Sequence, residues 1–98
     1  MSTLEINNAN IPIFDYESLT LEKITAAIKV VEKAHKLNFS TIRQFVTEHS
    51  STVISEFNKM KTFESVDQKF QVIDKVFSTM PDYKELNYYI LEIAILVS

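Results

Sequence analysis

Residues 31–51 read VEKAHKLNFSTIRQFVTEHSS, and the fold depends on whether this stretch forms one helix or two. The stretch contains no glycine and no proline, the residues that most often end a helix. However, His35, Asn38 and His49 occupy positions that helical spacing would otherwise assign to apolar residues. Asn38 and Ser40 also favour the start of a new helix, because their side chains can accept hydrogen bonds from free backbone amides.

Apolar residues continue at helical spacing on both sides of this stretch. From Leu21 to Met60 they recur at steps of three and four residues, so at about 100° per residue they share one stripe about 100° to 120° wide. The stripe consists of Leu21, Ile24, Ile28, Val31, His35, Asn38, Ile42, Phe45, His49, Val53, Phe57 and Met60, with Phe39 and Val46 inside it. Because the phase passes through Asn38 without a shift, we predict one long amphipathic helix over residues 21–60, with a break near Asn38 as the alternative. A continuous helix of this length would span about 60 Å.

Two shorter helices are predicted to pack against the long one. Residues 65–80 are predicted as a helix because Ser65 and Gln68 fit a capping box. Its apolar seam would consist of Phe63, Val66, Phe70, Ile73, Phe77 and Met80. A Met-Pro-Asp sequence would end it, and the nearly apolar residues 83–97 would follow. The last part, YYILEIAILV at residues 88–97, suits a buried helix or a strand, and its helical neighbours favour a helix.

The predicted fold class is therefore all-α, a helical hairpin or small bundle with coiled-coil-like spacing. Residues 14–98 would form a single helical domain, and residues 1–13 a flexible N-terminal arm. Asp15, Ser18 and Thr20 are candidates to cap the start of the long helix, since each carries a side-chain oxygen that can accept a backbone N–H.

The composition disfavours several classes of function. The chain has Gly 0, Cys 0 and a formal net charge of −3. Phosphate-binding loops and nucleophile elbows need glycine, thiolate sites need cysteine, and nucleic-acid binding needs a concentrated basic face. The sequence start lacks the pattern of a secretory signal, and no apolar run reaches the roughly 18 residues of a membrane span. We therefore expect a soluble cytoplasmic protein that is not an enzyme, with no cofactor, no metal, no nucleic-acid partner and no transmembrane segment.

The isolated polar residues have structural explanations. His35 and His49 are 14 residues apart, so on one helix they would lie about 21 Å apart and could not share a metal ion. The carboxylate pairs lie at segment ends, where helix N-termini favour negative charge. The phenylalanines follow helical spacing without interleaved lysine or arginine, so we expect a core or an apolar binding surface rather than a platform for stacking nucleic-acid bases.

The amphipathic stripe is the feature of the sequence from which a function can be inferred. It would either form the core of a three- or four-helix bundle or contact an apolar partner outside the chain, such as a helix, a lipid-like phase or a polymer surface. A bundle that opens would allow both. The residues expected to form the apolar binding face are Ile24, Ile28, Val31, Phe39, Ile42, Phe45, Val46, Val53 and Phe57.

Parts of the chain resemble the core of the phasin family. The resemblance covers about residues 14–77 and follows a pattern of Glu-Lys-Leu, Leu-Asn-Leu, a basic residue, Glu-x-Ser and a Lys-Asp-Pro-like corner. The residues that carry it are Val31 through Phe39, Arg43, Glu48-His49-Ser50, Lys61 through Glu64 and Gln68, with Phe14-Asp15-Tyr16 and Leu19 near the start. The chain departs from the family at Thr62-Phe63, which stands in place of the Asp-Pro-like corner, and in the apolar residues 88–97.

Phasins coat intracellular polyhydroxyalkanoate storage granules, so the resemblance implies a non-enzymatic coat protein at the granule surface in the cytoplasm. Its partners would be a hydrophobic polymer or lipid-like surface and other copies of the chain, in a homo-oligomer. A dozen half-buried apolar side chains would supply about 10 kcal/mol gross for such adsorption. The alternative is a small helical protein–protein interaction module, such as an adaptor or immunity-type bundle, which would bury the stripe and bind one partner through a patch outside it.

Overall fold

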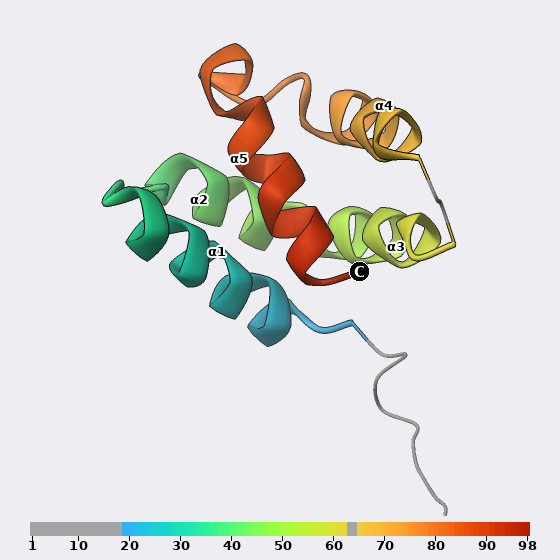
Figure 1. Ribbon diagram of the computed structural model, residues 1–98, viewed down its shortest axis with the longest axis horizontal. Helices are drawn as coiled ribbons and strands as arrows, with labels where there is room; N and C mark the ends of the chain where they lie inside the picture. The colour runs from blue at the N-terminus through green and yellow to red at the C-terminus, as the bar shows by residue number, and fades with distance from the viewer. Residues whose placement is uncertain (1–18, 63–64) are drawn as a thin grey trace, which may run out of the picture.

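The computed structural model of the protein describes residues 19–62 and 65–98, and over these residues the chain forms five α-helices and no β-strand (Figure 1). The helices are α1 (Leu21–His35), α2 (Ser40–Glu48), α3 (Ser50–Met60), α4 (Val66–Phe77) and α5 (Tyr83–Leu96). The predicted all-α class is therefore confirmed. The predicted flexible arm, the capping candidates Asp15 and Ser18, and the seam residue Phe63 lie outside the described residues.

Both ends of α1 are closed by local hydrogen bonds. At its start the hydroxyl of Thr20 accepts the backbone N–H of Lys23 at 3.2 Å, as predicted for this capping candidate. At its end Lys36 adopts the left-handed conformation, with φ 55°. The backbone N–H of Leu37 then donates to the carbonyl of Glu32 at 3.0 Å, and that of Lys36 to Lys33. This is a Schellman arrangement in which lysine takes the position that glycine usually occupies, because the sequence contains no glycine.

The continuous helix predicted over residues 21–60 is wrong, and the alternative break near Asn38 is what the structure shows. The carboxylate of Glu32 on α1 accepts the backbone N–H of Phe39 at 2.6 Å and also bonds the guanidinium of Arg43 on α2. The side chain of Asn38 accepts the backbone N–H of Ser40 at 3.0 Å. These oxygens satisfy amides at the start of α2 that would otherwise lack partners, so the break is stabilised by side chains on both sides of it.

A second break, which the spacing did not predict, separates α2 from α3 at His49. The backbone there departs from helical geometry, with φ −117° and ψ 33°. Hydrogen bonds still run from His49 N–H to the carbonyl of Phe45 and from Val53 N–H to the carbonyl of His49, each at 2.9 Å. The last hydrogen bond of α2 and the first of α3 therefore both use His49, and the ladder of helical hydrogen bonds is interrupted between them.

Three helices, α1, α2 and α3, replace the predicted long helix, and in each of them the apolar stripe faces the core. Eight of its positions are buried, namely Ile24, Ile28, Val31, Ile42, Phe45, Val53, Phe57 and Met60. His35, Asn38 and His49 are exposed and lie at the end of α1, in the link to α2 and at the α2–α3 bend. The three polar residues within the stripe therefore mark the places where the helix ends or bends, while the apolar residues between them form the core.

The last two helices complete the core. Ser65 caps α4 by accepting the backbone N–H of Gln68 at 3.3 Å, as the predicted capping box requires. The helix ends at Phe77, three residues before the predicted end at Met80. Within its predicted seam, Ile73, Phe77 and Met80 are buried and Phe70 is partly buried. Val66 is 56% exposed, so the seam prediction is wrong at that position, because α4 begins there, outside the helix contacts that bury its later turns.

Residues 88–97, for which a strand was the alternative, are helical as far as Leu96. The helix α5 lies across the middle of the molecule and contacts α1 on one side and α4 on the other (Figure 1). It contributes Tyr83, Ile90, Ile93 and Ala94 to the core. In the part of the chain that the structure describes, no helix is both long enough and apolar enough to cross a membrane.

The contacts of Glu32 predict a specific loss of stability. Replacing Glu32 with alanine should lower the free energy of unfolding by about 1–3 kcal/mol, because a buried N–H and a guanidinium lose a charged partner. Denaturation in urea followed by circular dichroism would measure it. The control is Glu48→Ala on exposed α2 surface, expected to change stability by less than about 0.5 kcal/mol. An equal effect of the two variants would contradict the role of Glu32.

A second prediction concerns the link between α3 and α4. Glu56 accepts a hydrogen bond from Lys59 at 3.0 Å and lies 3.5 Å from the ammonium of Lys75 on α4. The hydrogen bond and charge of Lys59, with the charge of Lys75, outweigh burial and lower the pKa of Glu56. Because the folded chain then binds this proton more weakly than the unfolded chain, stabilisation is present above the unfolded-state pKa of about 4.3 and is lost as the pH falls through the folded-state pKa.

The variant Glu56→Gln should therefore be less stable than the wild type near neutral pH and should differ less from it at about pH 3. Urea denaturation at both pH values would measure the difference, with the exposed Glu85→Gln as the matched control. If the gap between wild type and Glu56→Gln keeps the same size in acid, the ion pair does not act as described.

Candidate functional site

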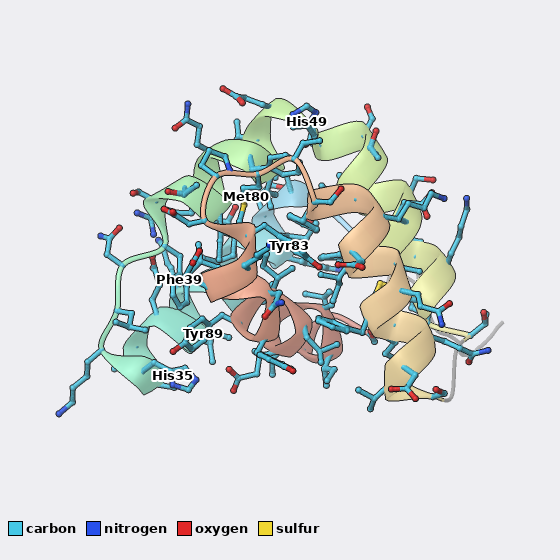
Figure 2. All side chains as sticks on the ribbon, turned by 90° about the horizontal axis from the view of Figure 1, so that it is seen from above. His35, Phe39, His49, Met80, Tyr83 and Tyr89 are labelled. Carbon is cyan, nitrogen blue, oxygen red and sulfur yellow. The ribbon has the colours of Figure 1, made fainter. Side chains whose placement is uncertain are left out.

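The titratable residues of the described chain are spread over the molecule and do not form a cluster that could hold a metal ion. Over residues 19–62 and 65–98, no group of three or more histidine, cysteine, aspartate or glutamate side chains is placed to hold a metal ion. His35 and His49 lie at separate places in the molecule (Figure 2). The ring of His49 lies tilted against that of Phe45, with 4.3 Å between the ring centroids. Each histidine therefore takes part in local packing.

A cluster of polar and aromatic side chains connects α5 to the end of α1. The Nε2 atom of His35 lies 2.8 Å from a carboxylate oxygen of Glu92, and its ring meets Tyr89 edge-on at 4.9 Å. Tyr89 also contacts Phe39, with ring centroids 5.0 Å apart, so three aromatic side chains gather at one corner of the molecule (Figure 2). Glu92 is the single charged residue in the apolar segment 88–97. Its contact with His35 thus explains a charge on an otherwise apolar stretch.

A side-chain hydrogen bond connects the start of α5 to α4. The hydroxyl of Tyr83 donates to a carboxylate oxygen of Asp74 at 2.6 Å. Burial raises the pKa of Tyr83 well above its ordinary value, and the hydrogen bond and negative charge of Asp74 add to the shift. The preceding residue, Asp82, is in the left-handed conformation with φ 61°, which ends the Met-Pro-Asp turn predicted between the two helices. Tyr83 therefore remains a neutral donor that positions α5.

The Tyr83–Asp74 contact predicts that Tyr83 does not ionise in the native protein near pH 10, where an ordinary tyrosine does. The alkaline absorbance titrations of wild type and Tyr83→Phe should therefore overlap up to the onset of alkaline unfolding. The variant should also be less stable by about 1 kcal/mol, because Asp74 loses a donor. A titration amplitude that is smaller in Tyr83→Phe than in wild type below the unfolding pH would contradict the assignment.

An exposed apolar surface remains along α4 and α5, which we call the α4–α5 aromatic face: Val66, Phe70, Tyr88 and Ile95. The rings of Phe70 and Tyr88 stack almost parallel, 5.6 Å apart at an interplanar angle of 8°. Tyr88 is 71% exposed, and Ile95 lies two helical turns further along α5 on the same side, 46% exposed. The face is therefore a rigid aromatic pair with aliphatic side chains beside it.

The number of apolar residues in segment 88–97 already indicated that part of α5 would be exposed. Segment 88–97 is apolar on nearly every side, yet a helix that contacts two neighbours cannot bury its whole circumference. A surplus of apolar residues on α5 was therefore predictable. Which of them point outward was not, because that depends on where α1 and α4 lie.

All nine residues predicted to form the apolar binding face lie in the core. Their exposed fractions run from 0% to 8%, with Phe45 the most exposed. The structure brings them together, as the stripe predicted, but turns them toward one another and toward α4 and α5. Contact with an outside surface would require the helices to separate, and that role stays a prediction.

A scan against protein-family models found no match, and neither a search of curated proteins nor a search of solved structures found one.

Proposed function

We propose that the protein is a non-enzymatic protein-binding module whose α4–α5 aromatic face binds an apolar helix surface of a partner protein. The observation that carries the proposal is the distribution of exposed apolar side chains. Six large hydrophobic residues are exposed in the described chain, and three of them, Val66, Tyr88 and Ile95, belong to the α4–α5 aromatic face. Large apolar side chains gathered on one side of a small protein are characteristic of an interaction site.

The stacked rings suit such a role. Tyrosine is enriched among the residues that dominate binding energy, since its ring offers a large apolar area at a small cost in side-chain entropy. Phe70 already holds the ring of Tyr88 in place, so little further ordering would be needed on binding. Covering the exposed parts of Val66, Tyr88 and Ile95 would contribute roughly 1–2 kcal/mol each. This sum is modest against the cost of association, so the face would act as an anchor within a larger contact.

A second copy of the chain is one partner that the face could accept. Two copies related by a two-fold axis would place the same residues opposite one another, which is the usual geometry of a homodimer. The homo-oligomer expected from the sequence stays a prediction. In the arrangement described here, two copies would associate through the α4–α5 aromatic face and not through the buried stripe.

The granule coat implied by the phasin resemblance also stays a prediction, with a condition that the fold adds. Its nine contact residues are buried, so adsorption to a polymer would require the bundle to open. Opening would expose the whole core and cost most of the free energy of folding. The interaction module requires no such change, which is why we favour it.

The test is a comparison of two surface variants. Tyr88→Ser/Ile95→Ser removes the centre of the face, and Val30→Ser/Leu37→Ser removes two exposed apolar residues elsewhere. A protein retained by wild type from a cell extract would be purified and titrated against each chain by calorimetry. We expect the first variant to bind it at least about tenfold more weakly, which corresponds to 1.4 kcal/mol, and the second to bind like wild type. Equal binding by both variants would contradict the assignment of the face.

Two further measurements separate the alternatives. Sedimentation velocity of wild type and Tyr88→Ser/Ile95→Ser would show whether a second copy occupies the face, since the variant should then be the smaller species. Mixing wild type with polyhydroxybutyrate particles and spinning them down would test the coat. Saturable adsorption accompanied by loss of the near-ultraviolet dichroism of the packed aromatics would favour opening onto a polymer and count against the module.

A further inference from the structure

The stacked rings of Phe70 and Tyr88 have carboxylates on both sides of them along each helix. Each ring has one carboxylate three residues before it and one four residues after it on its own helix: Asp67 and Asp74 on α4, Glu85 and Glu92 on α5. Residues at these spacings lie on the same side of a helix, with roughly 5–6 Å between their Cβ atoms. All four are exposed, so the α4–α5 aromatic face has an acidic border.

Two of these carboxylates are already used within the fold. Asp74 accepts a side-chain hydrogen bond from α5, and Glu92 contacts a histidine of α1. Within the described chain, the carboxylates of Asp67 and Glu85 take part in no hydrogen bond or ion pair. These two carboxylates can therefore pair with groups of another molecule without breaking a contact of the fold.

The lysines of the two helices do not cancel the acidic border. Lys75 lies 3.5 Å from Glu56 on α3, away from α5. Lys69 lies on the other side of Phe70 from the two aspartates, because consecutive helical residues are about 100° apart. Lys84 at the start of α5 adds one positive charge against the four carboxylates. The border as a whole is therefore negative.

The ring of Tyr88 offers a surface that suits a cation. One side of the ring stacks on Phe70, while the residue as a whole is 71% exposed, so the other side of the ring faces outward. The face of an aromatic ring carries the negative part of its quadrupole and attracts positive charge. An arginine guanidinium is planar, so it can lie flat on such a ring and donate to a carboxylate beside it, which a lysine ammonium matches less well.

We propose that the partner helix bound by the α4–α5 aromatic face is basic, with an arginine that lies over the ring of Tyr88 and pairs with Glu85. Other basic residues of that helix would face Asp67 and the rest of the border, and its apolar residues would cover Val66 and Ile95. This inference rests on the proposed function, since it names the chemistry of the partner that the same face binds.

The border also disfavours a second copy of the chain as the partner. Two copies related by a two-fold axis would bring the two acidic borders against each other. Like charges placed opposite one another across an interface reduce affinity, whereas opposite charges speed association and exclude wrong partners. The charges therefore favour a basic helix from another protein over self-association.

A pair of synthetic helical peptides tests the proposal on the full chain. Both carry the same stripe of leucines, and they differ only beside the stripe, where one has arginine and the other citrulline, which has nearly the same shape without the charge. Calorimetric titrations at low ionic strength should show wild type binding the arginine peptide at least about fivefold more tightly, because an exposed ion pair and a cation–π contact each contribute a modest amount.

Variants locate the source of this preference. Asp67→Asn/Glu85→Gln should lose most of it. The matched control Glu22→Gln/Glu48→Gln removes two exposed carboxylates from α1 and α2, so it changes the net charge equally and should keep the preference. Tyr88→Leu should prefer arginine about twofold less than Tyr88→Phe, because leucine keeps apolar area but has no ring. Circular dichroism would show that each variant is folded.

The outcomes separate this proposal from the proposed function. Equal binding of the two peptides by wild type, an equal loss of preference in the control variant, or no binding of either peptide at millimolar concentration would overturn the basic partner. The binding face itself is judged by Tyr88→Ser/Ile95→Ser. If wild type binds both peptides equally and this variant binds both more weakly, the face still binds apolar helices and only the arginine is wrong. If the variant binds them as tightly as wild type, the peptides bind elsewhere and both proposals fail.

Discussion

The bond network of Glu32 is the interaction on which the arrangement of the first three helices depends. Its carboxylate lies near the end of α1 and accepts the first free amide after the link, while also pairing with Arg43 on α2. A backbone that left the helix at this point without such partners would expose several unpaired groups next to the core. Because these partners form hydrogen bonds with the backbone, ending the helix here leaves fewer backbone groups unpaired. The left-handed Lys36 and the side chain of Asn38 complete the turn with their own hydrogen bonds.

This turn changes the direction in which the apolar stripe faces. On a straight helix the stripe would face outward along its whole length and would need a partner. Folded at residues 36–39 and bent at His49, the same residues face one another and form a single core with α4 and α5. The chain thereby uses its most apolar residues for stability. An apolar surface available for binding comes from residues that do not take part in the core, and α5 supplies half of the exposed large hydrophobic residues of the described chain.

The fold is positioned by polar contacts at the joints rather than by polar groups in the core. His35 with Glu92 holds the middle of α5 to α1, and Tyr83 with Asp74 holds its start to α4. Each contact joins residues from different helices: His35 and Glu92 meet near the surface, whereas the buried hydroxyl of Tyr83 reaches the exposed Asp74 from the edge of the core. The buried cluster itself is made of aliphatic and aromatic side chains.

The sequence by itself determined the all-α class, the cap at Ser65, the turn before α5 and the apolar stripe from Ile24 to Met60, and it offered Thr20 as one of three candidate caps. Those features follow from local hydrogen bonding and from a spacing that short windows of sequence contain. The same spacing could not decide whether the stripe would face a partner or itself. That outcome depends on Glu32 reaching Phe39 and Arg43, contacts of seven and eleven residues' separation that compete with the continuing helix. Only the tertiary structure decided it, and with it which side of α5 was left exposed, since exposure is set by where α1 and α4 lie and not by the residues of α5 alone.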